Sequence, residues 1–526
     1  MPSRSHASTS RTRRKKASGK APSVPAKSRE SNAAKPLKVS LTPKAPASRA
    51  KAHKAAELKP SAEAPISTFN RAVGFLDTLS NFESLRIVRY TPENFNLERM
   101  RTLCRRLGNP HLKYPTVHVA GTKGKGSTCA MVAAMLRAAG YRVGLYASPH
   151  LVDLRERIRV LDPAQDAAAL PQGEMISQAE FARLTRGIEP FVSSARLRPS
   201  WFDTFTAIAF AWFAQQEVDI AVIETGLGGR LDSTNVVEPL VTAVTSISMD
   251  HARQLGPTLA KIAAEKAGIF KPGAAPLTCE QDPEVEAVLR KTAQQNGAPL
   301  QVLGREIDFS TRFEASRMLG RHNRICFNTD QLSFDHLAVP LLGEHQAINC
   351  GVALGVVDQL RRRGFDRVTE ETCTAGLARL QLAGRMEVLR ESPIVVADAA
   401  HNAASIEALL KGLGQHFRYD ASVLIFGCCN DKDVGGMLER LVVGADKIIF
   451  TRIDSIRSAD PRELAQQYTE RFGRMAQVAE SLPEALQTAR RAATGDDLVC
   501  ITGSFYLVGQ AKKLFARRAA AGRSGR

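Results

Sequence analysis

The sequence predicts an α/β protein in which a domain with a glycine-rich loop precedes a smaller parallel α/β domain. A short apolar stretch, Val117–Val119, enters a glycine-rich turn, and an apolar run typical of a helix, Cys129–Ala139, follows it. Strand-like and helix-like segments then alternate along the chain, which is typical of parallel sheets covered by helices. From Pro393 the alternation restarts after a break. We therefore expect a P-loop-type domain followed by a Rossmann-like one.

Length and charge indicate four segments. A chain of 526 residues is long enough for about two to four domains. Residues 1–65 hold 16 Lys+Arg against 3 Asp+Glu, and residues 512–526 hold 6 Lys+Arg and no acid, so the two ends account for the whole formal charge of +19. We expect a disordered basic tail over 1–65, a first domain over 66–383, a second over 384–511 and a basic tail over 512–526.

The N-terminal tail admits three interpretations. It could attract nucleic acid or acidic surfaces, act as a solubilising extension, or be a transit peptide. Its many prolines argue against the amphipathic helix of a transit peptide, and the solubilising extension is favoured. No nucleic-acid partner is required.

Cysteine usage and hydropathy bound the location. The nine cysteines are scattered, with no Cys-x-x-Cys spacing, which is typical of a reduced, cytoplasmic protein. No run of 18 apolar residues occurs, so no membrane partner is expected. We expect a monomer acting on small molecules.

The first candidate site is the glycine-rich loop Gly121-Thr122-Lys123-Gly124-Lys125-Gly126-Ser127-Thr128. Between a strand and a helix, its backbone N–H groups and the helix dipole favour an anion, and Lys125 can reach the β- and γ-phosphates of a nucleotide. Ser127 or Thr128 then offers a hydroxyl to Mg²⁺. Gly126 separates Lys125 from Ser127, a departure from the standard P-loop spacing. A glycine turn without ligand is the alternative, and the strand–loop–helix context favours the nucleotide.

Further polar residues follow the predicted strands. The strand Val143–Ala147 ends at Ser148, and the strand Asp219–Ile223 ends at Glu224 followed by glycines. Ligands gather at the carboxyl ends of strands in open α/β sheets. Glu224 could cap a turn, but beside a phosphate loop a Mg²⁺-ATP role is favoured. The strand Val241–Ser248 delivers Asp250 and His251.

The remaining elements of both domains are predicted in the same way. Helices are expected over Phe205–Ala214, Leu259–Lys266 and Asn349–Arg361, with βα alternation leading up to the last of these. In the second domain we expect strands at Ile394–Ala397, Val423–Phe426, Lys447–Thr451 and Leu498–Thr502, and helices near 403–416, 433–444, 461–472 and 482–493.

Together these motifs resemble the folylpolyglutamate synthases, which, with the bifunctional dihydrofolate synthases, belong to the Mur ligase superfamily. The resemblance covers roughly 66–510. Its motifs, in order, are Gly121–Ser127, Ser148-Pro149-His150, Glu224–Gly229, Asp232-Ser233-Thr234-Asn235, Asp250-His251, Glu265–Ile269, His345-Gln346 with Asn349, Gly384-Arg385, Asp398 with His401-Asn402, Asp431-Lys432-Asp433 and Gly503-Ser504-Phe505.

The resemblance implies a P-loop-type Mur ligase ATPase domain and a Rossmann-like glutamate-ligase domain, with ATP between them. Lys125 and Ser127 would serve the phosphate loop, and Ser148, Glu224 and His251 would ligate Mg²⁺. The remaining nucleotide contacts would come from Asn349, Arg385, Asp398 and His401. Lys266 matches a lysine that is carbamylated in the family; without the resemblance it reads as an ordinary surface helix lysine.

The implied reaction is the ATP-dependent addition of L-glutamate to folate, to dihydropteroate or to both, within folate biosynthesis and one-carbon metabolism. ATP would phosphorylate the acceptor carboxylate, with Lys125, Arg385 and His251-bound Mg²⁺ neutralising the developing charge, and the amine of glutamate would attack the acyl phosphate. The choice of acceptor stays open at this point.

Two other functions fit the sequence less well. A cell-wall Mur ligase needs a UDP-binding domain before the loop, and the stretch 66–115 is too short for one. A non-catalytic ATP-binding module is disfavoured by the intact Lys125, Glu224, His251 and Lys266. The chain departs from the family pattern at Lys123, where bacterial members usually have asparagine and eukaryotic ones lysine. It departs again at Ala403, where proline is common.

Overall fold

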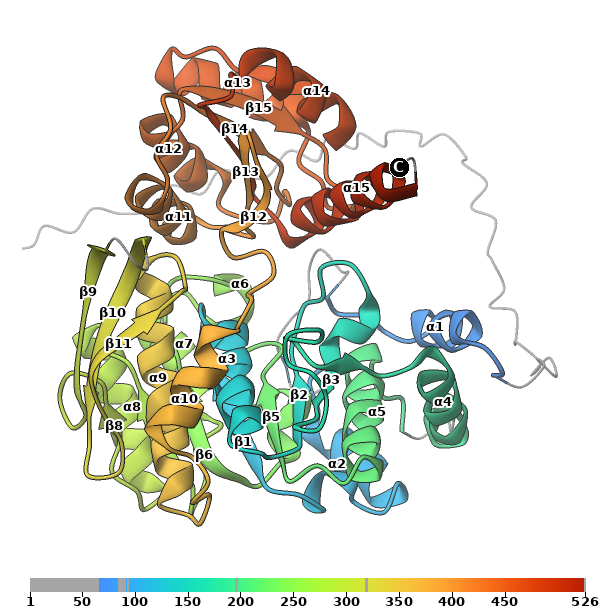
Figure 1. Cartoon of the computed structure of the whole chain (residues 1–526). Helices are drawn as coiled ribbons and strands as arrows, with labels where there is room; N and C mark the ends of the chain where they lie inside the picture. Colours follow the sequence, from blue (N-terminus) through green and yellow to red (C-terminus); the bar gives the residue numbers. More distant parts are fainter. Residues whose placement is uncertain (1–65, 84–90, 92–93, 194–196, 317–319, 525–526) are drawn as a thin grey trace, which may run out of the picture. The chain divides into compact units, whose positions relative to one another are not determined.

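The computed structural model describes residues 66–83, 91, 94–193, 197–316 and 320–524. The predicted basic tail 1–65 lies outside the described residues. The described residues belong to one compact unit, Ala64–Arg526. We call the part that carries the first two sheets the middle lobe, and the part that carries the third sheet the C-terminal lobe (Figure 1).

The middle lobe is built on an eight-stranded sheet with the order β4-β3-β2-β5-β1-β6-β7-β8. Six neighbouring strands run parallel, and β3 and β4 are antiparallel additions at one edge. The strands are β1 (Thr116–Ala120), β2 (Val143–Tyr146), β3 (Ile158–Leu161), β4 (Glu174–Met175), β5 (Ile220–Glu224), β6 (Pro239–Val244), β7 (Ala275–Thr278) and β8 (Gln301–Val302). Every residue of β1, β2 and β5 is buried, as expected for parallel strands covered on both faces.

Two apolar cores lie on the two faces of the central strands. One contains α3 (Lys125–Ala138), α9 (Glu344–Arg361) and α10 (Glu370–Ala378), and α3 packs against both of the others. The other contains α1 (Phe69–Asp77), α2 (Leu97–Arg106), α4 (Gln178–Val192) and α5 (Trp201–Gln215). A third cluster joins α7 (Leu259–Ala267) and α8 (Pro283–Gln295) to the β6–β8 side.

A small antiparallel sheet interrupts the alternation. Its strands are β9 (Asp308–Ser316), β10 (Gly320–Asn328) and β11 (Ser333–Val339), in the order β11-β10-β9. The prediction that βα alternation continues up to the helix at Asn349–Arg361 is therefore wrong here. Side chains of β9 are mostly exposed or half-buried, so this segment lacks the continuous apolar runs of a buried parallel strand.

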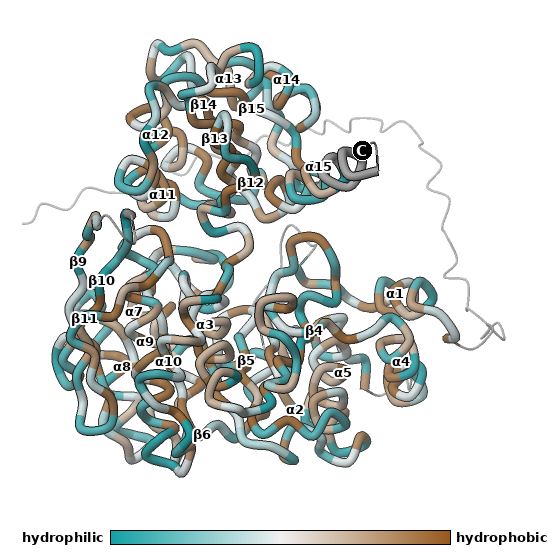
Figure 2. The backbone as a smooth tube through the Cα atoms, in the orientation of Figure 1, coloured by the Kyte–Doolittle hydropathy of each residue, from teal (hydrophilic) through white to brown (hydrophobic). Residues whose placement is uncertain are grey.

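The C-terminal lobe is a six-stranded sheet in the order β12-β13-β17-β14-β15-β16, parallel except for β12. Its strands are β12 (Glu387–Glu391), β13 (Ile394–Ala397), β14 (Ser422–Phe426), β15 (Lys447–Thr451), β16 (Gln477–Ala479) and β17 (Leu498–Thr502). One face packs on α11 (Ala403–His416), α12 (Val434–Gly444) and α13 (Pro461–Phe472), the other on α14 (Leu482–Ala492) and α15 (Phe505–Ser524). Figure 2 shows hydrophobic residues concentrated on β13 and β14. The predicted α/β class and the four predicted strands are confirmed.

Some boundaries differ in ways that affect the site. The helix α3 begins at Lys125, four residues before the predicted start, so that the loop lysine is its first residue. The strand β6 ends at Val244, which leaves 245–250 as a loop at its carboxyl end. The helix α15 extends to Ser524 and so includes most of the segment 512–526, which was predicted to be a basic tail. Among the described helices, none is long and apolar enough to cross a membrane.

Candidate active site

The glycine-rich loop joins β1 to α3, as predicted, and two of its glycines touch neighbouring side chains. Gly124 has φ +88°, and a β-carbon there would lie 2.0 Å from Oδ1 of Asn349. Gly121 has φ +148°, and its β-carbon would lie 1.8 Å from Oγ1 of Thr245. Left-handed backbone and close approach both require glycine. The loop therefore exposes backbone N–H groups at the N-terminus of α3, where an anion is favoured.

Lys125 faces a buried carboxylate. Its Nζ lies 3.9 Å from Oε1 of Glu224, whose other oxygen accepts a hydrogen bond of 2.9 Å from the backbone N–H of Ser148. Burial raises the pKa of Glu224, and Lys125 and the Ser148 N–H act against that rise. A cation placed beside Glu224 would favour its ionised form further. Three predicted residues, from α3, β5 and the end of β2, thus meet at the carboxyl edge of the sheet.

Lys266 is buried on α7, with a side chain that reaches back to the loop. Its Nζ donates a hydrogen bond of 2.7 Å to the carbonyl of Gly121, and the residue is 4 % exposed. Burial holds the pKa of Lys266 well below its usual range, and the neighbouring Lys125 and Lys123 lower it further. The interpretation of Lys266 as a surface lysine without a partner is wrong.

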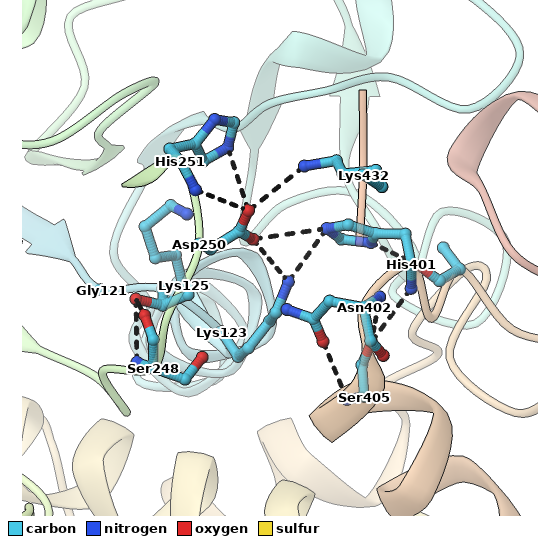
Figure 3. A network of polar contacts seen from close by, with 12 residues as sticks. Gly121, Lys123, Lys125, Ser248, Asp250, His251, His401, Asn402, Ser405 and Lys432 are labelled. Atoms are coloured by element: carbon cyan, nitrogen blue, oxygen red, sulfur yellow. Dashed lines mark hydrogen bonds and ion pairs between the residues drawn. The ribbon is translucent and has the colours of Figure 1, made fainter. Parts of the chain in front are cut away.

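A polar network links the loop to the C-terminal lobe (Figure 3). Asp250, in the loop after β6, accepts hydrogen bonds from Nζ of Lys123 at 3.0 Å and from Nζ of Lys432 at 3.2 Å. Nε2 of His401 lies 3.0 Å from Nζ of Lys123. His251 has φ +51°, and its backbone N–H donates to Asp250 at 2.9 Å. The predicted ligand His251 therefore belongs to the Asp250 network.

The C-terminal lobe places two more predicted residues near its first strand. Asp398 is buried and accepts hydrogen bonds of 2.8 Å from the backbone N–H groups of Met386 and Ala400. Burial raises the pKa of Asp398, and Arg385 acts against it. The Arg385 guanidinium lies 5.0 Å from the centre of the Phe505 ring, a cation–π distance. Besides its predicted nucleotide contact, Asp398 has a structural role, because it holds the turn that precedes His401.

The remaining predicted residues lie at the start of α3 and on α9. Ser127 and Thr128 are buried in the first turn of α3. Asn349 is 6 % exposed and its carbonyl accepts a 3.4 Å hydrogen bond from Thr128 Oγ1. The loop N–H groups of Thr122 and Lys123 both donate to the carbonyl of Ser246, which fixes the loop to the segment after β6.

Sequence reasoning missed the roles of Asp250 and Lys432. Both residues stood in quoted motifs, and neither was given a function. The available signal was the acid-rich surroundings of Lys432 and the position of Asp250 beside a predicted ligand. Within the described residues, no group of three His, Cys, Asp or Glu side chains forms a metal cluster. A cation at Glu224 would therefore need hydroxyl, phosphate or water ligands as well.

Two family models match the chain. The Mur ligase middle domain covers residues 204–357, and the Mur ligase glutamate ligase domain covers residues 384–505. The dihydrofolate synthase/folylpolyglutamate synthase of Bacillus subtilis is 34% identical over 79% of this chain and 94% of its own length. The enzyme of the same name from Escherichia coli is 32% identical over 88% of this chain and 99% of its own.

Solved structures agree with these matches. Mycobacterium tuberculosis folylpolyglutamate synthase complexed with ADP superimposes with a TM-score of 0.72 at 33% identity, covering 85% of this chain and 98% of that one. An Escherichia coli structure in complex with DHPP and ADP gives a TM-score of 0.73 at 31% identity, covering 88% and 100%. The chain therefore belongs to the folylpolyglutamate synthase/dihydrofolate synthase branch of the Mur ligase family, whose members are ATP-dependent ligases of glutamate.

Proposed function

We propose that this site adds L-glutamate both to dihydropteroate and to folates already bearing glutamate. The observation that carries the proposal is Lys125 at the N-terminus of α3, 3.9 Å from the buried Glu224. A cation, a buried carboxylate and the N-terminus of a helix at one sheet edge suit a nucleoside triphosphate with its metal. Both activities stand in the names of the Bacillus subtilis and Escherichia coli relatives.

The nucleotide contacts follow from where the residues lie. Within the loop Gly121–Thr128, the N–H groups at the start of α3 hold the phosphates, and Lys125 neutralises charge that develops on the transferred phosphoryl group. Asn349, packed against Gly124, borders the loop on the α9 side. Arg385, Asp398 and His401 supply contacts from the C-terminal lobe. The ADP in the two related solved structures supports this assignment.

The residues present fit a Mg²⁺ ion. Mg²⁺ prefers oxygen ligands and retains several waters. The Glu224 carboxylate and the hydroxyls of Ser148 and Ser127 are oxygen donors, and His251 adds a nitrogen. When bound, the ion would offset phosphate charge and orient the phosphates. The chain's own task is to hold Glu224 ionised, which Lys125 and the Ser148 N–H support.

We also propose that Lys266 carries a carbamate. CO₂ adds to a neutral amine, and burial together with Lys125 and Lys123 favours the neutral form of Lys266. The carbamate would carry a negative charge into a region rich in lysine. Without it, the amine donates to the carbonyl of Gly121.

The two lobes bind different substrates, and their bounds are those of the predicted domains. Residues 66–383 bind ATP, and residues 384–511 present L-glutamate, in keeping with the glutamate ligase domain matched at 384–505. The protein acts as a monomer on small molecules. A cytoplasmic location is consistent with nine free cysteines, eight of which are buried.

Acceptor-dependent ATP turnover tests the proposal. The purified protein is given Mg²⁺, ATP and L-glutamate with dihydropteroate, with tetrahydrofolate or with neither, and ADP release and product mass are followed. We expect ADP release only with an acceptor, and each product to be heavier by one glutamyl residue. Lys125→Met should abolish both, whereas Lys291→Met, on the exposed side of α8, should change neither. Equal ADP release without acceptor would overturn the proposal, and product from only one acceptor would overturn its bifunctional part.

A further inference from the structure

Asp250 joins three parts of the chain through one carboxylate (Figure 3). Its Oδ2 accepts from Nζ of Lys123 at 3.0 Å, and its Oδ1 accepts from Nζ of Lys432 at 3.2 Å. Lys123 lies in the phosphate loop of the middle lobe, whereas Lys432 lies between β14 and α12 of the C-terminal lobe. The Asp250 side chain is only 9% exposed. A largely buried carboxylate therefore bridges cations from the two lobes.

His401 extends the bridge with a defined tautomer. Its Nδ1 lies 2.8 Å from the carbonyl oxygen of Ala399, which can only accept, so Nδ1 carries the proton. Its Nε2 then presents a lone pair to Nζ of Lys123 at 3.0 Å. Lys123 thus donates to an imidazole of the C-terminal lobe and to Asp250 at once. The tautomer follows from the partner of the opposite ring nitrogen.

The charge balance of this cluster depends on Asp250. The Asp250 carboxylate lies within ion-pair distance of two ammonium groups, Nζ of Lys123 and Nζ of Lys432. If its charge were removed, two ammonium groups from different lobes would share a poorly solvated region and repel each other.

The two loop lysines have different partners. Lys125 faces Glu224 at 3.9 Å, on the side proposed for the nucleotide, whereas Lys123, two residues earlier, faces Asp250 and His401. Lys123 therefore connects the phosphate loop to the lobe junction. Its backbone N–H donates to the carbonyl of Ser246, which fixes the backbone of Lys123 to the segment after β6.

We propose that Asp250 is a positioning residue that holds the C-terminal lobe in register with the phosphate loop. It does so by binding Lys432 directly and by orienting Lys123 toward His401. The consequence for the reaction rests on the proposed function, because a ligase must keep groups of both lobes against one acyl phosphate while excluding water. The bridge itself rests only on the contacts above.

A double-mutant cycle with hydrogen exchange tests this bridge. The variants are Asp250→Asn, Lys432→Met and their combination, and the readouts are kcat, the Kd for ATP and amide exchange over residues 398–405 and 430–436. Asp250→Asn preserves the shape of the side chain and removes its charge. Lys411→Met is the matched control, because the exposed Lys411–Glu344 pair also joins the two lobes, at 2.5 Å, and exposed pairs contribute little.

We expect kcat to fall at least 100-fold in each single variant, and the double variant to fall no further than Asp250→Asn, because Asp250→Asn already removes the pair with Lys432. The Kd for ATP should rise by a smaller factor than kcat falls, since Lys125 and the loop glycines are intact and only the contacts from the C-terminal lobe are loosened. Exchange over 398–405 and 430–436 should accelerate at least tenfold in all three variants, and Lys411→Met should match the wild type within twofold in every readout.

Unchanged exchange in Asp250→Asn and in Lys432→Met would overturn the proposal, as would multiplicative losses of kcat in the double variant. The exchange experiment needs neither ATP nor an acceptor. It therefore separates failure of the bridge from failure of the proposed function, which would appear as absent turnover in the wild type. If Asp250→Asn does not fold, the exchange of Lys432→Met alone decides the outcome.

Discussion

A β-carbon on Gly124 probes the geometry of the phosphate loop directly. The residue has φ +88°, and the added carbon would lie 2.0 Å from Oδ1 and 2.7 Å from Cγ of Asn349. Ordinary contact begins at 3.4 Å, so one group must move by about 1.4 Å. Left-handed backbone costs an alanine about 1–2 kcal/mol, and overpacking beside a buried side chain costs about 1–3 kcal/mol more.

The sum, about 2–5 kcal/mol, is smaller than the unfolding free energy of most domains, about 5–15 kcal/mol. Gly124→Ala should therefore fold with a lowered Tm. Loop displacement that costs about 1.4 kcal/mol of binding already weakens ATP tenfold, so we expect the Kd for ATP to rise at least tenfold. Titration calorimetry with Mg²⁺-ATP measures the Kd, and circular dichroism measures the Tm.

The matched control for this variant is Gly187→Ala. Gly187 is exposed on α4, with nothing within 4 Å of the added carbon, and should lose neither stability nor ATP binding. Adding Gly124→Ala to Asn349→Ala should lower the Tm by less than adding it to the wild type. Asn349→Ala removes the side chain that the new β-carbon would meet, so that only the backbone strain remains. A Gly124→Ala protein that melts like the wild type and binds ATP within threefold of it would refute the loop geometry.

Three further predictions concern charge and burial. Glu224→Gln should shift the Mg²⁺ dependence of turnover to higher concentration by removing a charged oxygen ligand, and an unchanged Mg²⁺ titration would remove it from the metal site. Lys266→Ala should lower turnover sharply, with partial rescue by short-chain carboxylates; an unmodified amine in the intact mass of active protein would contradict the carbamate. Burial lowers the pKa of His118 to about 3, below its usual 6.5, so it folds neutral. The free energy of unfolding is therefore independent of this group above pH 6.5. Between pH 6.5 and pH 3 it falls as the pH falls, by up to about 1.4 kcal/mol per pH unit, because only the unfolded chain binds the proton. Denaturant unfolding of His118→Gln, which retains a polar partner for Thr234, should show a shallower acid slope, and identical slopes would exclude this source.

The α/β class could be predicted from the sequence because parallel strands buried on both faces are continuous apolar runs. The strands Ile394–Ala397, Lys447–Thr451 and Leu498–Thr502 have the predicted bounds. The helix predicted near 403–416 is α11, and its start is capped by the Asn402 side chain, which accepts a hydrogen bond from the backbone N–H of Ser405. The glycine loop was equally legible, because strand, glycines and helix are adjacent in the chain.

The antiparallel strands β9–β11 escaped prediction for a physical reason. The side chains of β9 are half-buried or exposed. The strands β10 and β11 bury Ile325, Phe327 and Val339 in the core that contains α3 and α9, but they alternate these with polar residues and lack the continuous apolar run of a parallel strand buried on both faces. The burial of Lys266 was also invisible. A lysine after a glutamate on a short helix looks solvated, and only the packing of α7 beneath the loop takes its amine out of water.

By itself, the sequence determined the class of fold, the phosphate loop and nearly all residues of the candidate site. Only the tertiary structure decided which of them meet. Lys123 is 127 residues from Asp250 and 278 from His401, and Lys432 is 182 residues from Asp250. Periodicity and capping act over a few residues, whereas ion pairing and desolvation act through space, between whatever side chains the packing of the two lobes brings together.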